Sequence, residues 1–98
     1  MTSVTDNEQR SRFELRVDEE LAGWLDYRPA GDSIIIAHTE VLKEHEGAGH
    51  GGVLVRSALD GARDKGKTVI VMCPFAIAYI DRHPELDEFL APHARRRT

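Results

Sequence analysis

The sequence predicts a small α/β (α+β) domain, in which an antiparallel β-meander is followed by a parallel β-α-β unit and C-terminal helices. Two observations support this fold class. In the first half of the chain, apolar and polar residues alternate over short runs, as they do in half-buried strands. In the second half, apolar residues recur at helical spacing between two continuous apolar runs, a pattern typical of a strand–helix–strand unit. A length of 98 residues fits one domain.

The first half is expected to hold three strands joined by short turns. They are predicted at residues 13–17, 21–28 and 33–41. Gly23 marks a possible bulge in the second of them. Residues 29–32 read Pro-Ala-Gly-Asp and favour a turn, because proline presets φ and glycine permits a positive φ. Residues 1–12 are polar and lack periodicity, so a disordered leader is predicted there.

The second half is expected to alternate helix and strand. The apolar residues of 49–65 recur at helical spacing, and Gly66 fits the position that ends such a helix. Residues 68–72 form a mainly β-branched run, typical of a strand that is buried on both faces. Two helices then follow, predicted from Pro74 to His83 and over residues 86–90.

These elements place the folded domain at residues 13–91 and leave 92–98 as a flexible basic tail with Arg95-Arg96-Arg97. The net charge of −4 provides no global field that would favour nucleic acid. The apolar runs fall short of the roughly 20 residues that a membrane span needs. A single cysteine, Cys73, excludes an internal disulfide and fits a reducing cytoplasm.

The most informative segment lies between the third strand and the first helix, and it reads Gly47-Ala48-Gly49-His50-Gly51-Gly52. Glycines let a ligand approach the backbone, and the helix start adds free N–H groups and a partial positive charge. Together these form an anion cradle suited to phosphate. The segment satisfies the dinucleotide pattern G-x-G-x-x-G, but the next strand lacks the acid that would hold the ribose. The Gly-Lys-Ser/Thr of a Walker A loop is also absent.

A family resemblance accounts for more of the chain. Glu46-Gly47-Ala48-Gly49-His50-Gly51 resembles the pyrophosphate loop Gln/Arg-x-x-Gly-x-Gly/Ala of the GNAT superfamily of acetyl-CoA-dependent N-acetyltransferases, with Glu46 in place of Gln or Arg. The chain is also similar to a small single-domain subfamily of about a hundred residues with a Cys-Pro-Phe motif. The segments that carry this likeness are His38-Thr39-Glu40-Val41, Cys73-Pro74-Phe75, Ala78-Tyr79-Ile80 and Arg82-His83-Pro84-Glu85. The resemblance implies a minimal GNAT-like fold.

The resemblance also implies a cofactor, acetyl-CoA or coenzyme A, and a route for it. In such folds two strands splay apart, and the pantetheine arm pairs with the first of them through its backbone, here over Thr39 to Lys43. The cofactor-binding residues implied are Thr39, Val41, Lys43, Glu46, Gly47, Ala48, Gly49, His50, Gly51, Gly52, Cys73, Pro74 and Phe75. The acceptor would be a primary amine of a small molecule or a protein, and the chain is expected to be a monomer or weak dimer without nucleic-acid or membrane partners.

Acetyl transfer requires a base for the amine and an acid for the departing thiolate. His38 and Glu40 lie on one strand face by their spacing, and either could act as the base. The resemblance places a tyrosine acid in the second helix, where either Tyr79 or Ile80 occupies the position. Cys73 could form an acetyl-enzyme, contact the cofactor or only fill space.

An alternative from another class is a non-catalytic acyl-CoA-binding or protein-interaction module on the same fold. Both possibilities predict coenzyme A binding, and only the enzyme predicts turnover. A metal site is not expected, because the histidines show neither an i, i+4 pair nor a cysteine partner.

Overall fold

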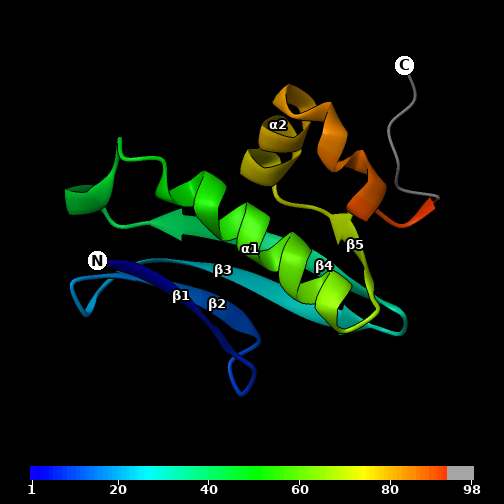
Figure 1. Cartoon of the computed structure of the whole chain (residues 1–98), viewed down its shortest axis with the longest axis horizontal. Helices are drawn as coiled ribbons and strands as arrows, with labels where there is room; N and C mark the ends of the chain where they lie inside the picture. The colour runs from blue at the N-terminus through cyan, green and yellow to red at the C-terminus, as the bar shows by residue number, and fades with distance from the viewer. Residues whose placement is uncertain (93–98) are drawn as a thin grey trace.

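The computed structural model describes residues 1–92 and consists of a five-stranded sheet with two helices packed on it (Figure 1). The strands are β1 (Thr2–Asn7), β2 (Arg12–Val17), β3 (Glu20–Ala30), β4 (Ser33–Val41) and β5 (Thr68–Val71). The helices are α1 (His50–Asp64) and α2 (Pro74–Arg82), with 3-10 turns η1 (Lys43–His45) and η2 (Pro84–Phe89). The predicted mixed α/β class is confirmed. The predicted basic tail lies almost wholly outside the described residues.

The strands follow one another across the sheet in chain order, from β1 to β5. Every neighbouring pair is antiparallel except β4 and β5, which are parallel and joined through α1. The β2–β3 hairpin turns through Asp18 and Glu19, whose φ angles of 50° and 74° match the two-residue turns that suit the twist of a hairpin. The β2–β3 register shifts beside Gly23, so that Ala22 has no partner on β2, in line with the bulge expected there.

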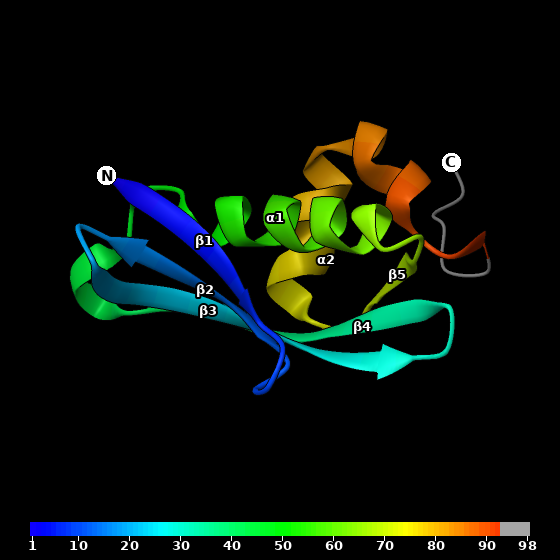
Figure 2. The same ribbon diagram turned by 60° about the horizontal axis from the view of Figure 1, so that its bottom comes forward.

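Both helices cover the same face of the sheet and share one hydrophobic core (Figure 2). Strand residues of this face, including Leu15, Leu25 and Ile36, are fully buried. They pack against the apolar side of α1, whose Leu54 and Leu59 are also fully buried. Ala76 and Ile80 bring α2 into the same cluster. No helix among the described residues is long and apolar enough to cross a membrane.

The N-terminal residues correct one expectation, because strand β1 occupies half of the predicted disordered leader. The strand pairs with β2 over its whole length, from Thr2 opposite Val17 to Asn7 opposite Arg12. Polar contacts hold it in place: Tyr27 donates a hydrogen bond to Asp6 at 2.7 Å, and Lys65, the C-cap of α1, donates to the same carboxylate at 3.1 Å. A terminal segment becomes ordered when it is tied down in this way. Burial and the bond to Asp6 hold the pKa of Tyr27 well above its usual value.

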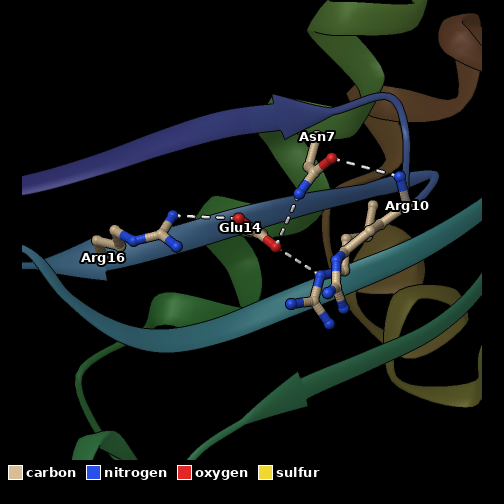
Figure 3. Close-up of polar contacts among 5 residues, drawn as sticks. Asn7, Arg10, Glu14 and Arg16 are labelled. Atoms are coloured by element: carbon tan, nitrogen blue, oxygen red, sulfur yellow. Dashed lines mark hydrogen bonds and ion pairs between the residues drawn. The ribbon is translucent and has the colours of Figure 1, made fainter.

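The sheet face away from the helices carries a charged cluster around Glu14 (Figure 3). Glu14, on β2, is only 6% exposed. It accepts hydrogen bonds from Arg12 at 2.6 Å, from Arg16 at 3.2 Å and from Asn7 at 3.3 Å. The bond from Arg12 is the first cause that lowers the pKa of Glu14, although burial opposes it. The carboxylate is therefore ionised and fully partnered.

Because the pKa of Glu14 is lower in the folded chain than in the unfolded chain, its ionisation adds stability above pH 4.5, and that stability is lost as the pH falls through the folded-state pKa. We expect Glu14→Gln to lower the free energy of unfolding at neutral pH by about 1 to 2 kcal/mol, since a charge-assisted cluster loses its anion. The free energy of unfolding of the variant should also fall less steeply than that of the wild-type chain as the pH is lowered. Urea unfolding at several pH values measures both effects, with the exposed Glu20→Gln as the control. If the free energy of unfolding of Glu14→Gln falls as steeply with acid as that of the wild-type chain, the stabilising role of the ionised Glu14 is contradicted.

Candidate active site

The site begins where the two parallel strands separate. Strand β5 pairs with β4 only from Ser33 to Ile36, and the amide of Met72 makes the last bond, to the carbonyl of Ile36 at 2.9 Å. The register of β4 against β3 shifts at Ala37, which has no partner on β3, and a bulge at this point bends the strand. The rest of β4 runs on to Val41 without a partner from β5. Its backbone edge is therefore free to pair with an extended ligand.

The glycine loop leads from this strand into α1. Gly47 and Gly49 have φ angles of 86° and 80°, a region that favours glycine, and Gly49 is the N-cap of the helix. The first intrahelical bond runs from the amide of Val53 to the carbonyl of Gly49, and no side chain caps the helix start. The amides of the first turn consequently remain without intrahelical acceptors, in the part of the helix that carries partial positive charge.

Gly51 and Gly52 serve a different purpose, which is the packing of α1 against α2. Both are buried in the first turn of α1. A Cβ atom at Gly51 would lie 2.6 Å from the ring of Phe75, and one at Gly52 would lie 2.6 Å from the ring of Tyr79. Real Cβ atoms do not approach so closely, so any larger residue at either position would force the facing ring to shift.

Strand, loop and helices enclose a pocket of about 790 Å³, within the range of small-molecule sites. The predicted site residues that line it are Thr39, Glu40, Val41, Glu46, Gly47, Gly49, His50, Gly51, Gly52, Phe75 and Tyr79. The lining also includes His45, Val53, Arg56 and Arg82. The Nε2 atom of His45 is buried without a hydrogen-bond partner in the described part of the chain. The pocket thus joins an anion-binding helix start to a free strand edge.

The remaining predicted site residues do not line this pocket, and they are His38, Lys43, Ala48, Cys73 and Pro74. His38 is 56% exposed and its Nε2 lies 3.0 Å from a carboxylate oxygen of Glu40, a contact that fits their expected place on one strand face. Cys73 is buried directly behind the lining, with its Sγ 3.6 Å from the hydroxyl of Thr39.

Arg56 is one of three polar lining residues that were not among the predicted site residues, together with His45 and Arg82. Its Nε donates a hydrogen bond to the Tyr79 hydroxyl at 2.8 Å. Its guanidinium lies 5.7 Å from the centre of the Tyr79 ring and 3.6 Å from a carboxylate oxygen of Glu85. The bond to Tyr79 raises the pKa of Arg56, which therefore stays charged. The sequence did contain one signal for Arg56 as a site residue, which is its position two turns along the helix that follows the glycine loop.

Residues 12–89 match the family model of the GCN5-related N-acetyltransferases. The chain belongs to this family. It is accordingly an N-acetyltransferase domain, and the mixed sheet and helices described above form the fold of this family. The predicted Cys-Pro-Phe subfamily stays a prediction. No curated protein matches the sequence.

Solved structures share the fold of this GCN5-related domain at low sequence identity. A GCN5-like protein from Staphylococcus aureus is 22% identical with a TM-score of 0.69, and the match covers 91% of this chain and 87% of that one. N-acetylglutamate synthase from Neisseria gonorrhoeae, complexed with coenzyme A and N-acetyl-glutamate, is 20% identical with a TM-score of 0.64, over 78% of this chain and only 19% of that one. Ribosomal-protein-alanine N-acetyltransferase from Brucella melitensis is 20% identical with a TM-score of 0.56, over 82% and 60%.

Proposed function

We propose that the chain binds acetyl-CoA in the pocket between β4 and the start of α1 and transfers its acetyl group to a primary amine. The observation that carries the proposal is that one pocket joins a free strand edge to an uncapped helix start. Coenzyme A carries an extended pantetheine arm followed by a pyrophosphate, which is the order of the strand edge and the helix start along the pocket. The complex of the Neisseria synthase with coenzyme A supports this choice of ligand.

The cofactor contacts proposed are mainly backbone contacts. Thr39 and Val41 offer amides and carbonyls of the free β4 edge to the pantetheine arm, and the strand backbone continues towards Lys43. Gly47 to Gly52 offer the loop and first-turn amides to the pyrophosphate, with Ala48 between the two positive-φ glycines. Phe75, which follows Pro74 at the start of α2, forms part of the apolar wall.

In the transfer step, the amine nitrogen forms a bond to the acetyl carbon and the carbon–sulfur bond of the thioester breaks. We assign Tyr79 as the acid that gives its proton to the departing thiolate, because its side chain lines the pocket. Glu40, 45% exposed and also in the lining, receives the amine proton directly or through water, and His38 holds its carboxylate. Cys73 is assigned a supporting role through Thr39, since its sulfur is buried behind the lining.

A ligand series tests the site, with thermal unfolding as the readout. Acetyl-CoA and dephospho-CoA should both raise the melting temperature, whereas pantetheine, which lacks the pyrophosphate, should have little effect. At a hundredfold excess over Kd the stabilisation is about 2.7 kcal/mol. If millimolar coenzyme A produces no shift, the proposed cofactor is wrong.

Turnover is measured as free thiol released from acetyl-CoA in the presence of a panel of primary amines. Release that depends on the amine supports the enzyme. Binding of acetyl-CoA without release across a broad panel would instead favour the non-catalytic acyl-CoA-binding module.

Glu46 should weaken cofactor binding, because it places an exposed anion in the lining next to the proposed pyrophosphate position. We expect Glu46→Gln to tighten coenzyme A binding by about fivefold at low salt, which corresponds to roughly 1 kcal/mol for two charges in a watery setting. The gain should shrink as salt is added. Calorimetric titration measures the change. Glu44→Gln removes an equal charge from the preceding 3-10 turn outside the lining, and it should leave Kd nearly constant.

A further inference from the structure

The contact between Arg56 and Tyr79 constrains the direction of the tyrosine proton. A guanidinium carries only donors, whereas a phenol hydroxyl both donates and accepts. In the 2.8 Å bond, Arg56 must therefore be the donor and the phenol oxygen the acceptor. The hydroxyl proton of Tyr79 cannot point at Arg56 and is left to point elsewhere around the oxygen. Tyr79 lines the pocket, so the pocket is one direction open to it.

The neighbouring groups hold this arrangement in place. Glu85 lies 3.6 Å from the Arg56 guanidinium and 3.8 Å from Nδ1 of His83. The His83 ring packs on the Tyr79 ring at 4.3 Å, and the ring of Phe75 stacks at 6.4 Å on α2. On the α1 side, the ring lies against Gly52, which has no Cβ atom and so allows this close approach. The tyrosine ring is thus fixed from three elements, α1, α2 and the start of η2.

We propose that Arg56 is a positioning residue for the acetyl transfer: it occupies the acceptor side of the Tyr79 oxygen, directs the hydroxyl proton into the pocket and stabilises the phenolate once that proton has moved to the thiolate. This inference rests on the proposed function. The proton passes from the Tyr79 oxygen to the sulfur of coenzyme A, the electron pair stays on the phenol oxygen, and the adjacent cation offsets the new negative charge. The tyrosine regains a proton from solvent after the product leaves.

The decisive experiment is a double-mutant cycle on kcat. Arg56→Gln should lower kcat by roughly tenfold while the KM for acetyl-CoA changes little, and Arg56→Lys should recover part of the loss. In a Tyr79→Phe background, Arg56→Gln should have no further effect on kcat, because the hydroxyl on which it acts is absent. Losses that multiply in the double variant would overturn the proposal.

The same helix offers a matched control. Arg63 lies two turns further along α1, packs its guanidinium 3.7 Å from the centre of the Phe89 ring and lies 3.8 Å from a carboxylate oxygen of Glu88. It therefore repeats the ring and carboxylate contacts of Arg56 outside the pocket lining. Arg63→Gln should keep the wild-type kcat. An equal loss in Arg56→Gln and Arg63→Gln would assign both to helix packing and overturn the proposal.

A second readout does not depend on turnover. In urea unfolding of the free protein, the effects of Arg56→Gln and Tyr79→Phe should not add, because each variant removes one partner of the 2.8 Å bond. Other titratable or charged groups near the ring are Glu85 and His83, with Glu40, Glu46, His45, His50 and Arg82 elsewhere in the lining. These groups are the same in every variant of the cycle, so the coupling reports the contact between Arg56 and Tyr79. Additive losses of stability would overturn the inference, and absence of wild-type turnover would overturn only the proposed function.

Discussion

Tyr79→Phe is expected to lower kcat for acetyl transfer by roughly 10²- to 10⁴-fold, the usual contribution of a positioned general acid. The ring should stay where it is, because its contacts with His83 and Phe75 do not involve the hydroxyl. Coenzyme A binding should therefore persist in calorimetric titration. The loss should be smaller for thioesters with a more acidic leaving thiol, since such a thiolate departs without a proton.

Tyr27→Phe is the control for this prediction. It removes a hydroxyl that is bound to Asp6, next to Lys65 at the C-terminal end of α1. It should lower the melting temperature while kcat, measured well below that temperature, stays near the wild-type value. A Tyr79→Phe variant that retains full kcat would exclude Tyr79 as the acid.

Gly52→Ala should affect both stability and activity. The new methyl group would lie 2.6 Å from one ring atom of Tyr79 and 3.2 Å from its oxygen, so the ring must move. Overpacking of this kind costs about 1–3 kcal/mol, and the better helix propensity of alanine returns up to about 1 kcal/mol. A displaced ring should lower kcat by about 10²-fold, as misplacement of a reacting group by about 1 Å does.

Gly66→Ala separates these two effects. Gly66 has a φ of 71° and open space around it, so alanine there strains only the backbone, by about 1–2 kcal/mol. It lies outside the pocket lining. We expect a comparable loss in urea unfolding with unchanged kcat. If Gly52→Ala matches the wild-type chain in both measurements, the ring is not held by α1.

Most of the fold followed from periodicity. The alternation of Phe13, Leu15 and Val17 and the helical spacing of 49–65 both correspond to observed elements, because each buries one apolar face in the shared core. Strand β1 did not follow, since Val4 is its one large apolar residue and its order depends on Asp6 contacts from distant parts of the chain. The final helix proved to be a 3-10 turn that begins at Pro84.

The sequence located the pocket better than it located the chemistry inside it. The glycine segment was recognisable as an anion cradle from its local spacing, whereas the family resemblance implied the roles of the β4 edge, Phe75 and Tyr79, which also line the pocket. The packing role of Gly51 and Gly52 could not be predicted, because their close approach to α2 is a contact between separate helices. Arg56 was missed for the same reason: its partners Tyr79 and Glu85 lie more than 20 residues away along the chain.

Strand β1 has a consequence for how the molecule behaves beside other copies of itself. A border strand exposes unpaired backbone groups that invite edge-to-edge association. Here the border strand β1 is short and polar, and its neighbour in the sheet, β2, carries the buried Phe13 and Leu15. A shortened chain that begins after Asn7 would present the edge of β2 instead. We therefore expect the first seven residues to act as a solubility element, and their removal to cause association at concentrations where the intact chain stays dispersed.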